Sequence, residues 1–344
     1  CVMTSPFAST PNPDDRLRLL HEIDTWSEDP ESVLIEALRD PYPAVRFFAA
    51  EELASRALAE DVLVKMVDET ETDAAQRAAA VLGLRRPLSA SSIATVVNAT
   101  RDDDPTVRYH AMLALDENTK TAPLKEVATR AVSDEDDDVA IVAAQWAAQF
   151  GWVDLASAID ESRRGRNAKD VRLQFAIALV GLVPDELPGG TVHDLIEGLS
   201  DDRTARAAAL AIATADVKAA VPSLVTVTRK FWYHVIIRID AAAVLASLGE
   251  EIGFEKLRRF VLDRKEHVAA YACECVGRYK LEPLEDAVAE VVWSTDDRAL
   301  AAVVALNQLG TDSARAMLSR VEQSHPVEEA AFKVGESTIE VGAH

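Results

Sequence analysis

One short motif recurs along this chain of 344 residues and constrains its fold more than any other feature. In a clear copy, Val45 and Arg46 are followed by the pair Ala49 and Ala50 and then by Leu53. The apolar members stand at i, i+4, i+5 and i+8, which places them on one face of an α-helix. The alanines are small, so a neighbouring helix can approach closely. A motif that returns at a regular interval predicts an array of repeated helical units.

The interval between successive copies ranges from 29 to 34 residues. The first position of the motif is occupied in turn by Val45, Ala74, Val107, Val139, Val171, Ala205, Ile237 and Val268. Each copy is followed by a short turn and a second segment rich in Leu, Ile and Val, whereas period-2 alternation of β-branched residues is absent. A further copy lies near Asp297, and a degenerate unit spans residues 14–40. The sequence therefore predicts an all-α fold of about ten two-helix units.

Acidic turns join each unit to the next. Asp40 and Asp104 each precede a proline, and residues 134–138 are all acidic. Aspartate before proline favours a helix start, because the carboxylate accepts hydrogen bonds from free backbone N–H groups and proline fits the first helical position. The same turns would form an acidic edge that attracts a basic partner. Helix capping and partner attraction are compatible, and the sequence leaves both open.

A unit of 31–32 residues with the pattern D-P-x-x-V-R-x-x-A-A-x-x-L-G resembles the HEAT-like repeats of the armadillo-like superfamily, and most closely the short repeats of phycobilisome-lyase-type proteins. The resemblance implies a right-handed α-α superhelix, an α-solenoid. It also implies that the first helix of each unit lies on the outer face and the second on the inner, concave face. We therefore expect a flexible tail at residues 1–13, a repeat solenoid at 14–324, and a C-terminal cap and tail at 325–344.

The motif carries a recurrent arginine close to the acidic turns. We expect a structural ladder in which each arginine pairs with an aspartate between adjacent units, and we hold an anion site made of these arginines as the alternative. The arginines are Arg46, Arg108, Arg172, Arg206 and Arg238.

Two turns break the acidic pattern. The basic turn spans residues 163–169 and the aromatic turn spans residues 229–234, about two units later. Aromatic residues and arginine dominate the energetics of protein interfaces, so we predict that the two turns share one edge and contact an acidic or phosphorylated segment. The alternative is that the aromatic side chains cover an irregularity in packing. The candidate partner-binding residues are Arg163, Arg164, Arg166, Lys169, Arg229, Lys230, Phe231, Trp232, Tyr233 and His234.

The charge balance limits the classes of partner. The chain has 36 Lys and Arg against 58 Asp and Glu, a net charge of −22. A field of this sign repels nucleic acid and anionic membranes. We expect a protein partner and no nucleic acid, and no apolar run approaches the ~20 residues of a membrane span.

The cysteines and histidines indicate no catalytic or metal site. Cys273 stands at a core position of the motif, whereas Cys275 aligns with the more exposed Glu52. The His-Glu pairs that a HEAT-repeat di-iron hydroxylase needs are missing, and no phosphate-binding, dinucleotide-binding or hydrolase motif occurs. We expect no metal, no cofactor and no enzymatic activity.

The predicted function is a non-enzymatic protein-interaction scaffold that uses the concave face and the acidic turn edge. The alternative is a lyase-like, chaperone or regulatory subunit that acts on a protein carrying a bilin-type cofactor. The expected location is the cytoplasm. A second interpretation of the first residues is a mature lipoprotein anchored to a membrane through Cys1; otherwise Met3 is the true start.

Overall fold

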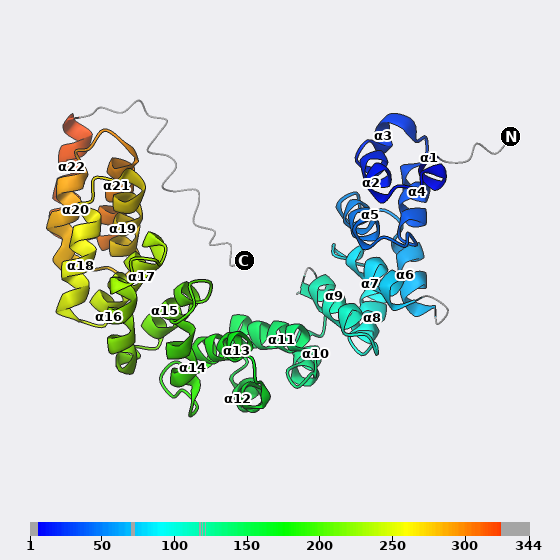
Figure 1. Cartoon of the computed structure of the whole chain (residues 1–344), viewed down its shortest axis with the longest axis horizontal. Coiled ribbons are helices and arrows are strands. Elements are labelled where there is room, and N and C mark those ends of the chain that lie inside the picture. The colour runs from blue at the N-terminus through cyan, green and yellow to red at the C-terminus, as the bar shows by residue number, and fades with distance from the viewer. Residues whose placement is uncertain (1–5, 70–72, 117, 119, 121, 325–344) are drawn as a thin grey trace. The chain divides into compact units, whose positions relative to one another are not determined.

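Helices form every regular element in the part of the chain that the structure describes. This computed structural model describes residues 6–69, 73–116, 118, 120 and 122–324. The prediction of an all-α fold is confirmed there. In chain order (Figure 1) the α-helices are α1 Pro6–Ser9, α2 Pro13–His21, α3 Ile23–Trp26, α4 Pro30–Ala37, α5 Pro43–Ser55, α6 Glu60–Asp68, α7 Ala74–Leu82, α8 Ala90–Ala99, α9 Pro105–Asp116, α10 Leu124–Ala131, α11 Asp137–Phe150, α12 Ala156–Gly165, α13 Lys169–Leu182, α14 Thr191–Gly198, α15 Ala205–Thr214, α16 Val221–Arg229, α17 Val235–Ser247, α18 Glu251–Val261, α19 Glu266–Arg278, α20 Glu285–Val291, α21 Asp297–Leu309 and α22 Asp312–Ser324.

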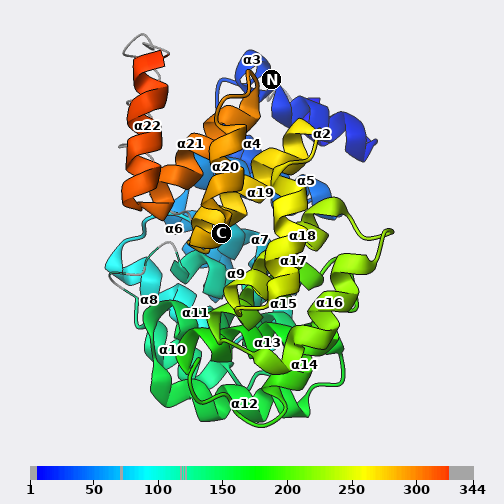
Figure 2. The ribbon, with the colours of Figure 1, turned by 90° about the vertical axis from the view of Figure 1, so that its left-hand side faces the viewer.

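The chain divides into two compact units, Cys1–Gly165 (unit 1) and Arg166–His344 (unit 2). The single array expected at residues 14–324 is therefore described here as two bodies. Within each unit, helices that carry the motif alternate along the chain with second helices, and the two kinds form two layers. In unit 2, for example, α19, α20 and α21 lie side by side (Figure 2). This is the arrangement of helix pairs that the HEAT-like resemblance implies.

The layer of motif helices is the more closely packed one. In unit 1, α5, α7, α9 and α11 contact each other in succession, as do α13, α15, α17, α19 and α21 in unit 2, whereas the second helices contact each other less. In a curved array the closely packed layer lies on the shorter, concave side. The expectation that the first helices lie on the outer face is therefore wrong for each unit. The cause is the alanine pair, because small side chains reduce the distance between helix axes.

The motif residues form the core that holds neighbouring helices together. Val45, Ala49, Ala50 and Leu53 are all fully buried, and most of their counterparts in later copies are buried as well. Two motif helices, α19 and α21, approach closely, since a Cβ atom on Gly277 would lie 2.9 Å from the Cα atom of Ala305. The motif is therefore the stacking device of the array, as its pattern predicts.

The chain ends differ in part from the expected boundaries. Of the tail expected at residues 1–13, Pro6–Ser9 form the short helix α1, and Phe7 is buried. Residues 1–5 and the cap and tail expected at 325–344 lie outside the described residues. Among the helices described, none has the length and apolar character that would let it cross a membrane.

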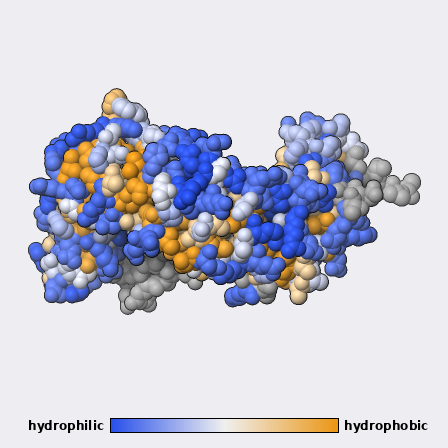
Figure 3. Space-filling view, turned by 90° about the horizontal axis from the view of Figure 1, so that it is seen from below, coloured by the Kyte–Doolittle hydropathy of each residue, from blue (hydrophilic) through white to orange (hydrophobic). Residues whose placement is uncertain are grey.

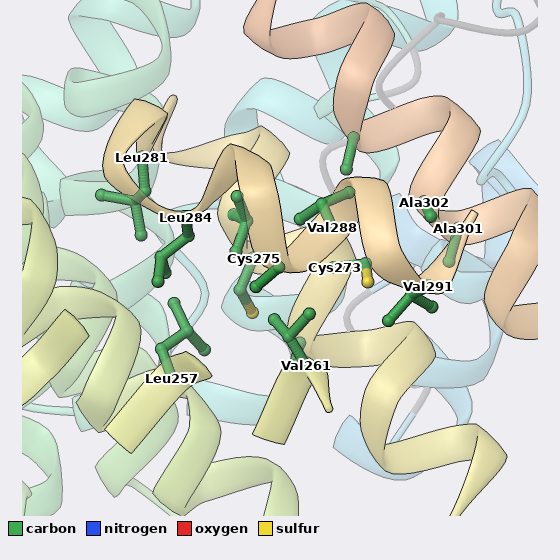
Figure 4. Close-up of a cluster of buried hydrophobic side chains, with 14 of the residues drawn as sticks. Leu257, Val261, Cys273, Cys275, Leu281, Leu284, Val288, Val291, Ala301 and Ala302 are labelled. Atoms are coloured by element: carbon green, nitrogen blue, oxygen red, sulfur yellow. The ribbon is translucent and has the colours of Figure 1, made fainter. Parts of the chain in front are cut away.

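Both described cysteines lie in the hydrophobic core of unit 2. Cys273 and Cys275 project from α19 into a cluster that includes Leu257, Val261 and Val288 (Figure 4). Burial raises the pKa of each thiol to about 12, so both stay protonated at neutral pH. Cys273 is a core residue as predicted. The expectation that Cys275 is more exposed is wrong, because α19 is covered by α17 on one side and by α21 on the other.

Candidate functional site

Three arginines in unit 1 form the predicted ladder with the acidic turns. Arg108 donates from Nε and Nη2 to the two carboxylate oxygens of Asp134, at 2.9 and 2.7 Å. Arg77 forms the same bidentate pair with Asp102, at 2.8 and 2.9 Å, and Arg16 forms it with Asp40, at 2.7 and 2.9 Å. In all three pairs both side chains are largely buried.

The ladder explains why these turns contain aspartate. The hydrogen bonds that Arg108 donates to Asp134 raise the pKa of Arg108, although burial opposes the rise. At Asp102 burial acts to raise the pKa, but the hydrogen bonds from Arg77 and from a backbone amide prevail and lower it. Each carboxylate also accepts a hydrogen bond from a backbone N–H two residues later. One aspartate thus joins a helix layer to the start of the next unit.

The sequence alignment missed two members of this ladder. Arg77 stands 31 residues after Arg46 and 31 before Arg108, so its copy of the motif starts at Gln76 rather than at Ala74. Arg16 lies in the degenerate first unit, where the motif is unrecognisable. The ladder position is defined by the carboxylates: Asp40, Asp102 and Asp134 each stand five residues before the first position of the following motif.

The other predicted ladder arginines depart from this geometry. Arg172 reaches Asp194 at 2.9 Å and Glu197 at 2.7 Å, both on α14, because its ladder position is Ser200. Arg46 donates to the carbonyl oxygen of Asp40, and its ladder position, residue 71, lies outside the described residues.

Arg238 is the clear exception. Its guanidinium lies over the ring of Phe260, 5.7 Å from the centroid, and its Nε atom is buried without a hydrogen bond to any described residue. Asp263 stands at the ladder position, but its carboxylate accepts the backbone N–H of Lys265. The prediction of an Arg–Asp pair is therefore wrong here, because the arginine packs on an aromatic ring instead.

At the aromatic turn the ladder carboxylate is replaced by Trp232 while the arginine, Arg206, is retained. The Nε atom of Arg206 lies 3.3 Å from a carboxylate oxygen of Asp240, which is fully buried on α17. Nη2 of Arg206 donates to the hydroxyl of Tyr271, which in turn donates to Asp240 at 2.7 Å. Burial raises the pKa of Asp240 despite these contacts. Arg206 thus pairs with a carboxylate in the layer of motif helices rather than with one in the turn.

The aromatic turn exposes two large side chains. Phe231 is 81% exposed and Trp232 is 66% exposed. Their rings contact each other edge to face, with centroids 5.0 Å apart and planes at 86°. Arg229 and His234, on either side of the pair, are also exposed. On the face shown in Figure 3, hydrophobic surface (orange) forms separate patches among hydrophilic surface (blue).

Tyr233 anchors the turn from within. It is 7% exposed, and its hydroxyl hydrogen-bonds the carbonyl oxygens of Leu199, at 3.2 Å, and Ser200. The ammonium group of Lys230 lies 3.0 Å from this hydroxyl and 4.5 Å from the ring centroid. The hypothesis that the aromatics cover a packing irregularity therefore holds for Tyr233 and fails for Phe231 and Trp232.

The basic turn has a different arrangement. Arg163 is buried and pairs with Asp160 at 2.7 Å, and Arg164 pairs with the same carboxylate. Both residues belong to unit 1, whereas Arg166 and Lys169 belong to unit 2. Arg163 therefore stabilises α12, and its assignment as a partner-binding residue is corrected.

Within unit 2, the remaining parts of the two turns flank one further turn. Lys169 approaches Asp201 at 4.0 Å, and Tyr233 binds the adjacent carbonyl of Ser200. Arg203, 80% exposed in its side chain, pairs with Asp201 as well, and its hydrogen bond lowers the pKa of that carboxylate. Arg166 lies over the ring of Phe175, with 6.0 Å to the centroid. Sequence reasoning thus found the exposed aromatic pair but did not separate it from Tyr233, which anchors the turn.

Comparisons with known proteins give only distant matches. No family model matches the sequence, and no curated protein matches it. Among solved structures, YibA of Escherichia coli aligns with a TM-score of 0.45 and 16% identity, over 88% of this chain and 99% of that chain. Yeast importin-β (Kap95p) aligns with a TM-score of 0.38 and 14% identity, over 97% of this chain and 58% of that chain. The all-α fold described above stands on the chain's own helices.

Proposed function

We propose that this protein is a non-enzymatic scaffold that binds a partner protein through the aromatic turn of unit 2. One observation carries the proposal. Trp232 occupies the place of a ladder carboxylate although the ladder arginine, Arg206, is present. The turn thereby gives up a bidentate ion pair and presents an exposed aromatic pair instead. A stabilising interaction has been exchanged for a surface feature that the isolated fold does not need.

The exposed pair has the properties of an interface anchor. Tryptophan and tyrosine are enriched among residues that dominate binding energy. Full burial of one such side chain contributes about 1.5–3 kcal/mol. The pair is held by Tyr233, whose buried hydroxyl fixes the turn to the carbonyls of Leu199 and Ser200. Because the anchor limits the freedom of the turn, less conformational entropy is lost when a partner covers it.

The charges around the turn indicate the partner's chemistry. Arg229 and Arg203 are exposed on unit 2 in a chain of net charge −22. We infer that the partner contributes an apolar residue flanked by carboxylates or phosphates. Attraction between these exposed charges weakens as salt increases, so the rate of association should fall with ionic strength more than the lifetime of the complex.

The test compares the wild type and two variants of the full chain as affinity baits. The first carries Phe231→Ser and Trp232→Ser. The second carries Leu300→Ser on α21, a control matched in exposure because Leu300 is 68% exposed. Proteins recovered from lysate of the source cells are quantified by mass spectrometry, and each candidate is then titrated as a purified protein against all three baits.

We expect at least one partner whose affinity falls about tenfold or more with the double variant and stays unchanged with Leu300→Ser. If every partner binds all three baits equally well, the aromatic turn is not a binding surface.

A further inference from the structure

A second surface lies in unit 1, along helix α10 (Figure 1). A hollow of about 420 Å³ opens at the C-terminal end of this helix, where Arg101, Arg108 and Arg130 converge. Asp102 and Asp134 also line it, but they are already neutralised by Arg77 and Arg108 in the ladder. The inner wall therefore holds arginine charge that the ladder does not use.

Arg130 is the uncompensated group. Within the described part of the chain its guanidinium makes one hydrogen bond, from Nη2 to the hydroxyl of Thr100 at 2.6 Å, and no carboxylate lies within ion-pair distance. Burial and the neighbouring Arg101 lower its pKa, although Glu126 and Asp134 act in the opposite direction. Arg108, in the same hollow, has its pKa raised by Asp134. The two arginines differ because Arg108 pairs with a carboxylate, whereas Arg130 has no ion pair among the residues that the structure describes.

An apolar hollow of about 390 Å³ lies at the other end of α10. Pro123 and Leu124 form one wall, and Phe150 and Trp152 form the other. The two aromatic rings are stacked, with centroids 5.1 Å apart, and Phe150 remains partly exposed. Stacked rings with an accessible edge suit a further aromatic side chain, since aromatic pairs prefer offset or edge-to-face contact.

The two hollows belong to one continuous surface. Glu126 lines the apolar hollow and stands one helical turn before Arg130, a rise of about 6 Å along α10. Arg101, which lines the basic hollow, lies 3.8 Å from Glu126. Leu124 lines the apolar hollow and Ala131 the basic one, and these residues are about 10 Å apart along α10. An extended peptide advances about 3.3 Å per residue, so residues three positions apart would span that distance.

The remaining acidic groups stand at the rim. Asp103 is exposed, and Glu135 has an exposed side chain that lies 3.9 Å from Arg108. Charges in solvent are screened within about 10 Å at ordinary salt, whereas the half-buried Arg130 is screened much less. An incoming carboxylate that enters the hollow therefore meets Arg130, which has no ion pair with any described carboxylate.

We propose that the α10 surface of unit 1 binds an extended peptide segment that carries an aromatic residue and, three residues away, a carboxylate. The aromatic side chain packs on Phe150 and Trp152, and the carboxylate accepts hydrogen bonds from Arg130 and Arg101. This surface is independent of the aromatic turn, which lies in unit 2. It extends the scaffold role with a partner chemistry of its own.

The probe is a set of fluorescein-labelled peptides, each with one Phe and one Glu separated by different numbers of Gly and Ser residues. Binding to the full chain is measured by fluorescence anisotropy up to millimolar protein or to the limit of solubility. We expect the tightest binding when Glu is three residues from Phe. Replacing Glu by Gln in that peptide should weaken binding about tenfold, because a charged hydrogen bond is lost.

A double-mutant cycle assigns the carboxylate to its arginine. Arg130→Gln should weaken binding of the Glu peptide about tenfold and leave the Gln peptide unchanged. Phe150→Ser should weaken both peptides. Arg18→Gln is the matched control, because Arg18 is an exposed arginine of unit 1 that pairs with Asp15 and does not line either hollow. Thermal unfolding confirms that each variant is folded.

Three results would overturn the proposal: no dependence on spacing, equal loss for the Glu and Gln peptides in Arg130→Gln, or no binding of any peptide. The variant with Phe231→Ser and Trp232→Ser should bind the probe like the wild type. Loss of peptide binding in that variant would show that the probe reports on the aromatic turn instead, and would equally count against the α10 surface.

Discussion

In the turn before α11, Asp134 accepts two hydrogen bonds from Arg108; in the turn before α17, the equivalent position is Trp232, and Arg206 pairs with Asp240 instead. The two turns occupy the same place in their repeats. In the first turn the side chain at this position joins two helices through an ion pair, whereas in the second turn it is exposed to solvent. The ladder pair is buried, and the rerouted Arg206 is half exposed. The residue at this position of the repeat thus either stabilises the packing of the helices or is exposed on the surface.

The basic turn provides a third case that clarifies the other two. Ala140 stands at the arginine position of its motif, and Arg166 stands at the following ladder position. Both the arginine and the carboxylate of the ladder pair are replaced here, so no ladder arginine is left without its carboxylate. At the aromatic turn only the carboxylate has changed. A ladder carboxylate that is replaced while its arginine is retained therefore indicates more strongly that the position serves a role other than stability.

Removal of a ladder arginine should have the largest effect. Arg108→Ala leaves Asp134 half-buried without its guanidinium, which should cost about 3 kcal/mol in the free energy of unfolding. Arg206→Ala should cost less, because its guanidinium is half exposed and Tyr271 still donates a hydrogen bond to the buried Asp240. Denaturant unfolding of both variants measures the difference. Equal losses would mean that the two turns do not differ as described.

Acid should weaken the ladder by a smaller amount. The pKa of Asp102 is lowered in the folded protein by Arg77, so the carboxylate contributes stability that is present above its unfolded pKa of 3.8 and is lost as pH falls through the lower folded value. The loss is smaller than for arginine removal because protonated Asp102 still accepts one hydrogen bond.

The measurement compares the wild type with Asp102→Asn from pH 6 to pH 2. The difference between their unfolding free energies should be constant at the upper end and shrink below about pH 4. A difference that is independent of pH would show that Arg77 does not stabilise the charged form.

Tyr233→Phe should have an intermediate effect on the aromatic turn. It removes the hydroxyl that binds the carbonyls of Leu199 and Ser200, at a cost of about 1 kcal/mol. Partner affinity should fall as well, because Phe231 and Trp232 lose their fixed support. Hydrogen exchange at residues 229–234 should increase. Unchanged exchange would show that the anchor lies elsewhere.

Trp232→Asp should have the smallest effect on stability and the opposite sign. The new carboxylate stands at the ladder position for Arg206 and should add about 0.5 kcal/mol, while partner binding at the aromatic turn should be lost. Trp232→Ser is the matched control, because it removes the ring without supplying a charge. If Asp and Ser give the same stability, Arg206 cannot reach the ladder position.

Part of the candidate site was predictable from the sequence. Phe231 and Trp232 stand out because they break a pattern that the other copies establish, and residues 163–169 stand out for the same reason. The sequence could not separate the two turns. Arg163 is buried by its pairing with Asp160 one helical turn earlier, and Tyr233 is anchored by carbonyl groups of a turn more than thirty residues away. Both outcomes depend on contacts with residues that the repeat pattern does not identify.

The sequence by itself determined the all-α fold, the two-helix repeat and the buried face of each motif helix, because helical periodicity places apolar side chains on one side of a local structure. Only the tertiary structure decided which layer lies on the concave side, why Cys275 is buried, where Arg206 finds a carboxylate and why Arg130 has no ion pair with a described one. These properties arise from distances between side chains of different repeats. Helical periodicity determines which side chains face an adjacent helix, whereas the packing of that helix determines which groups those side chains contact.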